Sequence, residues 1–296
     1  MERWWACAFN CTAWAPTTGE WDALLAGVPE EAERTRIARY RVEADRKRAL
    51  AGRVLLRRVA SEALGGPVEL ARTERGKPFV KAPAPGLFNL NLSHHGSWVV
   101  VCAHSARAVG VDVMEYEHPK GCRRVADFFA TMAGSFTAAE WLAIRAGAPE
   151  PGDAHLRTFY QLWSLKESYI KALGVGIGFG LQRASFELLA DPREERQEPS
   201  FARAARPVLD GRPVAEPRDE PRRARAARLV LDGRPDASFE FSLQELDAAH
   251  CVGVALQALE GRPAVLPFTW TVLSDLVHSP LQSGPAALPL DAHGAA

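Results

Sequence analysis

The pattern of apolar and polar residues predicts a chain of mixed strands and helices. Strands are predicted where apolar residues run together or alternate with polar ones over a few positions. The stretch at 87–104 shows both patterns, which predicts two strands joined by a polar turn at 93–97. The strand at 109–114 is expected to pair next to them. The other predicted strands lie at 4–14, after the glycine turn in 72–80, within 174–189, and at 237–246 and 250–259.

Helical periodicity accounts for most of the remaining sequence. A helix stop of two glycines, Gly65 and Gly66, ends the first helical stretch. Thr137 and Glu140 have the spacing of a capping box, so a helix should begin there. The last helix closes on Gly174. The predicted helical stretches are 29–64, segments within 122–146, and 153–173.

Two further segments stand apart from this pattern. ARAARPVLDGRP at 202–213 recurs at 224–235 with Leu229 in place of Pro207, a period of 22 residues. Two copies are too few for a solenoid, so we interpret them as a local tandem duplication. One Leu-Asp-Gly turn is expected to form a hairpin and the other copy a surface loop. The last thirty or so residues are rich in Pro, Ala and Gly and are expected to be disordered toward the end.

Composition excludes several classes of protein. The chain has 296 residues, enough for a sizeable core in one or two domains. With 36 basic and 36 acidic residues, it has no overall field to attract nucleic acid or an anionic membrane. No apolar run approaches a membrane span, and the start of the chain lacks a secretory signal. The five scattered cysteines are typical of a reducing compartment, so a cytosolic protein is predicted.

One carboxylate, Glu167, falls on the predicted buried face of the helix at 153–173. An unpaired buried charge costs several kcal/mol, so this acid needs a partner. A divalent metal with a cationic neighbour is one solution; the alternative is a simple helical ion pair with Lys171, worth a few tenths of a kcal/mol. At 100° per residue, the apolar stripe around Glu167 consists of Leu156, Phe159, Tyr160, Trp163 and Ile170, with Lys166 and Lys171 at its two edges.

A second acid, Asp112, lies in the predicted strand at 109–114. Because side chains alternate along a strand, Asp112 and Met114 share a face and Glu115 points to the other. A single acid is half of a typical metal site. His94 and His95 are adjacent, so their side chains diverge; one is a candidate phosphate donor, and the alternative is that both are ordinary turn residues.

The glycine-rich run GVGIGFG at 174–180 is not a good phosphate-binding loop. The dinucleotide fingerprint needs a glycine at the position of Phe179, and it precedes a helix, whereas this run follows one. We interpret it as a helix C-cap leading into a strand.

Four short motifs occur in a characteristic order along the chain: RTERGKP at 72–78, NLSH at 91–94, GVDV at 110–113 and WSLKESYIK at 163–171. The most specific part is the pattern Trp-x-x-Lys-Glu-x-x-x-Lys combined with Gly-x-Asp. Together the motifs resemble those of the 4'-phosphopantetheinyl transferases, in the long monomeric form of that family. The resemblance covers about residues 3–260, with a further similarity at 268–277.

The resemblance implies an α+β fold with two similar subdomains related by a pseudo-twofold and an active site in the cleft between them. It implies an N-terminal subdomain at 1–107 with the coenzyme phosphate contacts, and a C-terminal subdomain at 108–261 with the metal and catalytic residues. The duplicated loop would be an insertion at about 190–236. Residues 262–296 would form a partly disordered C-terminal extension, and the protein would be a monomer.

The resemblance also implies a reaction. The phosphopantetheine arm of coenzyme A would be transferred, with Mg²⁺, to a serine of an apo acyl, peptidyl or aminoadipate carrier domain, releasing adenosine 3',5'-bisphosphate. Carriers of fatty-acid synthase and of aminoadipate-semialdehyde dehydrogenase are the expected partners. The alternatives are a metal-dependent phosphodiester hydrolase and a non-catalytic module that binds coenzyme A or carriers.

Carried onto this sequence, the family pattern assigns a role to each site residue. Asp112 and Glu167 would bind Mg²⁺, Glu167 would be the general base, and Lys171 would stabilise the phosphoryl oxygens. Many bacterial members have a further acid at the position of Met114, where we expect water to complete the coordination instead. The residues expected to hold coenzyme A are Arg36, Arg72, Gly76, Lys77, Asn91, Leu92, Ser93, His94 and Lys171.

Overall fold

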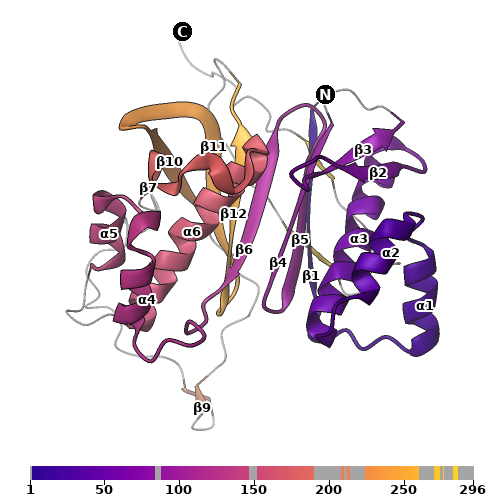
Figure 1. Cartoon of the computed structure of the whole chain (residues 1–296), viewed down its shortest axis with the longest axis horizontal. Helices are drawn as coiled ribbons and strands as arrows, with labels where there is room; N and C mark the ends of the chain where they lie inside the picture. Colours follow the sequence, from indigo (N-terminus) through magenta and orange to yellow (C-terminus); the bar gives the residue numbers. More distant parts are fainter. Residues whose placement is uncertain are drawn as a thin grey trace.

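Two five-stranded sheets and their helices make up most of the molecule (Figure 1). The structure, a computed structural model, describes residues 2–83, 88–146, 152–189, 208–209, 212–213, 224–259, 270–273, 276 and 283–285. This mixture of helices and sheets agrees with the predicted α+β class. Within the described residues, no helix has the length and apolar character needed to cross a membrane.

The first sheet has the strand order β13-β1-β5-β4, with β14 also paired to β1. Helix α3 covers one face and packs Leu55, Leu56 and Val59 into a core with the strands. We call this sheet and its helices the first half. Its elements are β1 (Arg3–Asn10), α1 (Thr18–Ala26), α2 (Glu31–Ala38), α3 (Glu43–Leu64), β2 (Glu69–Arg72), β3 (Pro78–Ala82), β4 (Asn89–His95), β5 (Trp98–His104), β13 (Thr271–Leu273) and β14 (Ser283–Pro285).

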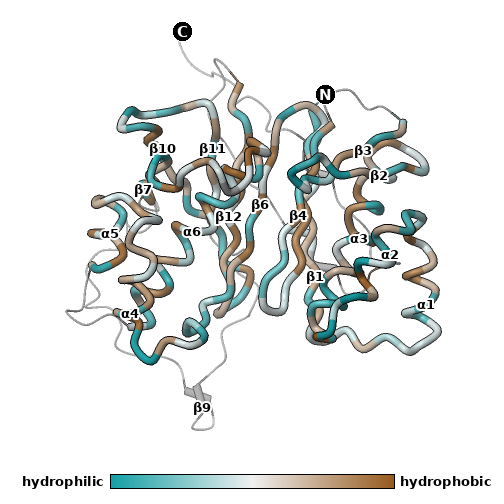
Figure 2. The backbone as a smooth tube through the Cα atoms, in the orientation of Figure 1, coloured by the Kyte–Doolittle hydropathy of each residue, from teal (hydrophilic) through white to brown (hydrophobic). Residues whose placement is uncertain are grey.

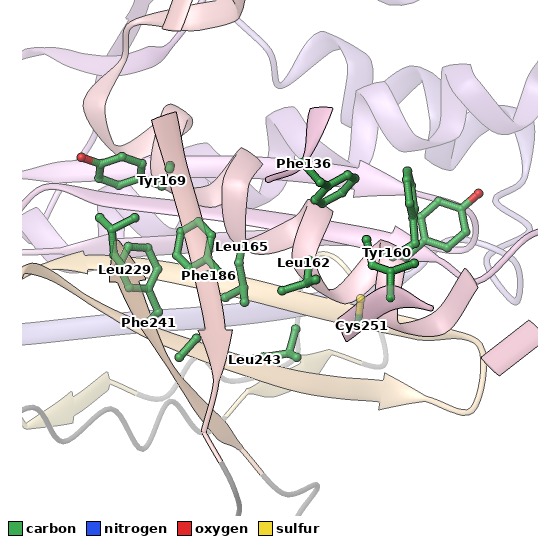
Figure 3. Packing of buried hydrophobic residues seen from close by; sticks show 14 of the residues in the cluster. Phe136, Tyr160, Leu162, Leu165, Tyr169, Phe186, Leu229, Phe241, Leu243 and Cys251 are labelled. Atoms are coloured by element: carbon green, nitrogen blue, oxygen red, sulfur yellow. The ribbon is translucent and has the colours of Figure 1, made fainter. Parts of the chain in front are cut away.

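The second sheet has the order β6-β12-β11-β10-β7, and helix α6 covers it. Figure 3 shows Leu162 and Leu165 of this helix above Leu243 and Cys251 of the strands. We call this sheet and its helices the second half. Its elements are β6 (Val109–Glu115), α4 (Val125–Thr131), α5 (Ala138–Ile144), α6 (Asp153–Leu173), β7 (Ala184–Leu188), β10 (Arg225–Leu231), β11 (Arg234–Asp247) and β12 (His250–Gln257), with 3-10 turns at Ala133–Ser135, Gly176–Phe179 and Leu181–Arg183.

The inner faces of the two sheets share a third apolar core. Small and β-branched residues meet there, including Ala8 and Val100 of the first sheet and Val111 and Val254 of the second. Figure 2 shows the hydrophobic colours gathered on the central strands and the hydrophilic colours on outer turns such as the one between β10 and β11. The layers therefore run helix, sheet, sheet, helix.

Helix α6 lies directly on the strands because two glycines leave room for its backbone. A Cβ added at Gly110 of β6 would lie 2.0 Å from the Ser168 carbonyl oxygen. A Cβ added at Gly253 of β12 would lie 2.7 Å from the Ser164 carbonyl oxygen. This close approach fixes the height of the helix above the sheet, and with it the distance between side chains on α6 and on β6.

Strands β4 and β6 lie side by side at the junction of the halves (Figure 1) and are joined through side chains. Asn91 Oδ1 accepts a hydrogen bond from the Val111 N–H at 3.0 Å. His95 Nδ1 accepts one from the Glu115 N–H at 2.8 Å. Ser93, between them on β4, also reaches β6. Asn91 and His95 thus satisfy two backbone N–H groups on the edge of β6 that faces β4, and Ser93 binds the Asp112 side chain.

One prediction about strand order is wrong. The strand at 109–114 does not pair next to β5; β6 pairs with β12, because β1 and β4 already occupy both edges of β5. The stretch at 29–64, predicted to be helical, forms two helices, α2 and α3, separated at residues 39–42. Helix α1, with a capping box of Thr17 and Glu20, and strand β2 were not predicted.

Predictions that rest on local signals are confirmed. Thr137 is the N-cap of α5 in a complete capping box with Glu140. Helix α6 spans the predicted residues and ends on Gly174 in the left-handed region, with φ of 69°.

Two predicted strands have different bounds in the structure. After the cap at Gly174, 3-10 turns replace the predicted strand as far as Ala184. The strand at 4–14 ends earlier than predicted, at Asn10.

The described residues of both copies of the duplicated segment pair as short antiparallel strands at corresponding positions. In the second copy Val230 pairs with Pro235, and the Asp-Gly pair at the turn has φ of 49° and 79°, as hairpin turns with left-handed central residues require. In the first copy Val208 pairs with Pro213, 22 residues earlier in each case. The expectation that one copy is a plain loop is therefore wrong for residues 208–209 and 212–213, and the rest of that copy lies outside the described residues.

Part of the C-terminal extension returns to the first half. Strands β13 and β14 both pair with β1, and the buried Leu276 belongs to the core beneath α3. The predicted disorder at the end of the chain lies outside the described residues.

Candidate active site

A cavity of about 740 Å³ lies where the two halves meet. Helix α2, the β2–β3 hairpin and β4 line it from the first half, and β6 and α6 line it from the second. A larger cavity of about 1140 Å³, beside β10 and β11, contains none of the predicted site residues. All of the predicted site residues line the first cavity: Arg36, Arg72, Gly76, Lys77, Asn91, Leu92, Ser93, His94, Asp112, Glu167 and Lys171.

Asp112 is held by one carboxylate oxygen and has the other free. Its Oδ1 accepts hydrogen bonds from Ser93 Oγ at 2.8 Å and from Lys171 Nζ at 2.6 Å. Lys171 Nζ also donates to Ser93 Oγ at 2.9 Å. The residue is 5% exposed, and its Oδ2 is buried without a hydrogen-bond partner among the residues that the structure describes. A buried, unpartnered carboxylate oxygen costs free energy unless a cation or donor completes it.

Glu167 does not form the predicted alternative ion pair with Lys171, because Lys171 pairs with Asp112 across the junction. No cation among the described residues forms an ion pair with the Glu167 carboxylate. Burial, with repulsion from Asp112, raises the pKa of Glu167, and Lys171 offsets only part of that rise. Glu167 is therefore a half-buried acid with an increased affinity for a proton.

The position of Glu167 on the helix also differs from the prediction. Helix α6 is buried on nearly every side, so the apolar stripe does not define its only buried face. Trp163, Glu167 and Lys171 follow one another at four-residue spacing, are only partly buried, and line the cavity. They form the side of the helix that is open to a ligand.

The two acids suit a hard divalent cation. The described residues contain no cluster of three or more His, Cys, Asp or Glu able to hold a metal. Mg²⁺, however, commonly takes one or two carboxylates and completes its shell with water and substrate phosphate. The unpartnered Asp112 Oδ2 and the Glu167 carboxylate fit that donor set. Met114 lines the cavity beside them, and Glu115 instead approaches His250 at 3.9 Å.

Basic residues of the β2–β3 hairpin reach across to the end of α6. Lys77 Nζ donates to the Ala172 carbonyl at 2.8 Å, and the Arg75 guanidinium donates to the Val175 carbonyl at 2.7 Å. Burial lowers the pKa of Lys77 to about 8. Sequence reasoning did not include Arg75, although the carbonyls at a helix C-terminus are general acceptors for such cations.

Strand β4 presents the two histidines differently. The strand continues to His95, so the predicted turn at 93–97 is shorter than expected and begins at Gly96. His94 is exposed on the cavity wall, and His95 contacts β6. Their side chains diverge as predicted. Asn91 is 3% exposed and uses its Oδ1 on β6, so it also joins the two halves.

Lys166, next to Glu167, has a role that periodicity did not reveal. Its side chain is fully buried and forms an ion pair with Glu140, also fully buried, at 2.9 Å. Its Nζ donates to the carbonyls of Leu181 and Ala184 as well. The sequence feature that could have pointed to this ion pair was Glu140 in the capping box. In the structure Glu140 also accepts a hydrogen bond from the Phe186 N–H, so its carboxylate faces inward toward Lys166.

Comparison with known proteins agrees with this geometry. Family models described as the N-terminal part of 4'-phosphopantetheinyl transferase and as the 4'-phosphopantetheinyl transferase superfamily match residues 12–106 and 108–212. A phosphopantetheinyl transferase of a Thraustochytrium species is 47% identical over 262 residues, 87% of this chain and 78% of its own length. The rat L-aminoadipate-semialdehyde dehydrogenase-phosphopantetheinyl transferase is 32% identical over 302 residues, 96% and 87% of the two chains. The 4'-phosphopantetheinyl transferase of Bacillus subtilis is 31% identical over 195 residues, 63% and 80%. The chain belongs to the 4'-phosphopantetheinyl transferase family.

Proposed function

We propose that this protein transfers the 4'-phosphopantetheine arm of coenzyme A to a serine hydroxyl of an apo carrier protein, with Mg²⁺ bound at Asp112 and Glu167. The unpartnered, buried Asp112 Oδ2 beside Glu167 is the observation that carries the metal assignment. In the reaction the serine oxygen forms a bond to the pyrophosphate phosphorus that bears the pantetheine arm. The bond from that phosphorus to adenosine 3',5'-bisphosphate breaks.

The first half supplies the coenzyme contacts. Arg36, Arg72 and His94 line the cavity on that side and are donors suited to phosphate oxygens. Lys77, at the hairpin next to α6, adds a further cation. A cavity of about 740 Å³ is within the usual range for sites that bury a ligand of this size.

The second half supplies the catalytic groups. A magnesium ion, when bound, would neutralise charge on the pyrophosphate and on the leaving phosphate. Ser93 and Lys171 hold Asp112 by one oxygen, so that the other stays directed away from them. Glu167, whose pKa is raised, is the general base that accepts the serine proton. Lys171, at the cavity wall, is the cation placed to stabilise the phosphoryl oxygens.

This function also implies an organisation for the chain. We propose two similar subdomains at 1–107 and 108–261 related by a pseudo-twofold, with the active site in the cavity at their junction and an extension at 262–296. The carriers would be acyl, peptidyl or aminoadipate carrier domains, and the enzyme would act as a cytosolic monomer. The partner names of the animal relatives support an aminoadipate-type carrier among the substrates.

Release of adenosine 3',5'-bisphosphate separates this function from its alternatives. We expect release only when coenzyme A, Mg²⁺ and an apo carrier are all present, and no release once EDTA removes the metal. Release without any carrier would instead identify a phosphodiester hydrolase. Binding of coenzyme A without turnover on any of several carriers would identify a binding module.

A third acid at the metal site should be tolerated. Met114 shares its strand face with Asp112 and is only partly buried, so Met114→Glu should keep Mg²⁺-dependent activity within about tenfold of the wild type, because Mg²⁺ accepts further carboxylate ligands. Steady-state rates across a Mg²⁺ titration measure this. The matched control is Met114→Gln, which has the same shape without the charge. An inactive Met114→Glu beside an active Met114→Gln would contradict the proposed metal position.

A further inference from the structure

Glu33, on α2, lies between two arginines from different elements. Its Oε2 is 2.8 Å from Nε of Arg53 on α3. Its Oε1 is 2.5 Å from Nε of Arg72 on β2. Arg53 is 5% exposed and Glu33 is 14% exposed, whereas Arg72 is 28% exposed and lines the cavity. One buried carboxylate therefore joins a buried arginine to an arginine of the candidate active site.

The contacts of Arg72 leave part of its guanidinium available. Nε and Nη2 donate to the two oxygens of Glu33, at 2.5 and 3.4 Å, and Nη1 donates to the Gly76 carbonyl at 2.8 Å. A guanidinium has five N–H donors, so N–H groups on both terminal nitrogens remain without an acceptor among the described residues. Two terminal N–H groups of this kind suit a phosphate.

The arrangement restrains a side chain that is otherwise flexible. A free arginine side chain loses rotamer entropy when it binds a ligand, and groups fixed beforehand bind more tightly. Arg53 holds the far oxygen of Glu33, so the carboxylate cannot simply follow Arg72. Arg36, three residues after Glu33 on α2, lines the same cavity. Without Glu33, Arg53 and Arg72 would both lose the carboxylate that lies between them.

We propose that Glu33 is a positioning residue that orients Arg72 for a phosphate of coenzyme A, with Arg53 as its buried anchor. This inference rests on the proposed function, because it takes coenzyme A to be the ligand of the cavity. Glu33 touches neither the reacting atoms nor the metal ligands. Its loss should therefore weaken coenzyme binding and leave the catalytic step nearly unchanged.

A double-mutant cycle on the full chain tests this coupling. The dissociation constant of coenzyme A is measured by calorimetry for the wild type, Glu33→Gln, Arg72→Met and the double variant. We expect Glu33→Gln to weaken binding about tenfold in the wild-type background and less than about twofold in the Arg72→Met background. At saturating coenzyme A, kcat of Glu33→Gln should stay within about twofold of the wild type. Equal losses in both backgrounds, or no loss in either, would overturn the proposal.

The neighbouring pair of Glu30 and Arg57 is a matched control. Glu30 contacts the Arg57 guanidinium on α3 and accepts from the Leu70 N–H of β2 at 3.3 Å, so it joins similar elements. Neither Glu30 nor Arg57 lines the cavity. Glu30→Gln should therefore lower stability and leave coenzyme affinity within about twofold. If Glu30→Gln weakened coenzyme binding as much as Glu33→Gln does, Glu33 would be a structural residue only.

Two further comparisons keep the result unambiguous. Removing Glu33 leaves Arg53 buried without its carboxylate partner, which is strongly destabilising in typical proteins. If Glu33→Gln does not fold, two variants that lack the Arg53 charge are compared instead. Arg53→Met/Glu33→Gln lacks the pair of Glu33 and Arg72, and Arg53→Met keeps it. The double variant should bind coenzyme A about tenfold more weakly than Arg53→Met, and equal binding would overturn the proposal. Wild-type protein that does not bind coenzyme A would instead refute the proposed function itself.

Discussion

Glu167→Gln is expected to lower transferase turnover by about a thousandfold or more while the protein stays folded. The variant removes both the proposed general base, typically worth about 10²–10⁴ in rate, and one of two metal ligands. The amide has nearly the same shape, so packing around Trp163 and Lys171 should be preserved. Turnover of coenzyme A on an apo carrier gives the rate, and thermal unfolding in EDTA gives the stability.

The same variant should not destabilise the metal-free protein. Burial and Asp112 raise the pKa of Glu167 above its ordinary value of 4.5, so the folded state favours the protonated form. The stability this group contributes is present at pH below about 4.5 and is lost as pH rises through the higher pKa of the folded protein. At neutral pH the amide avoids that loss, so the melting temperature in EDTA should be equal or higher.

Glu115→Gln is the control for Glu167→Gln. Glu115 is a partly exposed acid on β6 that approaches His250 and does not line the cavity. Its neutralisation should leave turnover within about twofold of the wild type, because its carboxylate approaches His250 and does not reach the cavity. Near wild-type turnover of Glu167→Gln would remove Glu167 from the catalytic role.

Lys166→Met is expected to have the largest effect on stability, a loss of about 3–5 kcal/mol in the free energy of unfolding. Lys166 and Glu140 are both fully buried, so the substitution leaves an uncompensated carboxylate in the core. It also releases the carbonyls of Leu181 and Ala184, and Leu181 lines the cavity. Urea denaturation of the metal-free protein measures the loss.

Two controls accompany this measurement. Lys166→Met/Glu140→Gln removes both charges and should recover much of the lost stability. Arg183→Met breaks the pair with Asp232, whose partners are 52% and 53% exposed, and should change stability little because solvent screens such a pair. A loss for Lys166→Met no larger than the loss for Arg183→Met would contradict the structural role of the buried pair.

Local sequence signals predicted local structure well. The cap at Thr137, the bounds of α6 and the turn at Gly174 depend on residues three or four positions apart, and all are confirmed. The same local reasoning offered Lys171 as a helical partner of Glu167. The ion-pair partner of Lys171 is instead Asp112, which is 59 residues away in the sequence. The close approach of α6 to Gly110 brings Lys171 and Asp112 together.

Periodicity failed where an element is buried on almost every side. A helical stripe identifies one buried face against a polar one, but α6 packs against strands, other helices and the 3-10 turns that follow it. Lys166 was therefore placed at an edge, although it is fully buried. The junction of β4 and β6 was equally hidden, because Asn91 and His95 replace a backbone ladder with side-chain contacts that no strand pattern encodes.

The gathering of the site residues was predictable only through the family resemblance. Composition and spacing left Asp112 as half of a site, and left His94 either as a phosphate donor or as an ordinary turn residue. The structure brings Arg36, Asp112 and Glu167 to one cavity from three separate elements. Glu33 gave no signal of its own, since its two arginine partners lie 20 and 39 residues further along the chain.

The central claim is that this cavity transfers phosphopantetheine to a carrier, and the mass of the carrier tests it most directly. Wild-type protein is incubated with coenzyme A, Mg²⁺ and several apo carrier proteins, and each carrier is measured by intact-mass spectrometry. We expect a gain of one phosphopantetheinyl group on at least one carrier, abolished by EDTA and by Glu167→Gln. An unchanged mass on every carrier, with the wild-type protein folded, would contradict the claim.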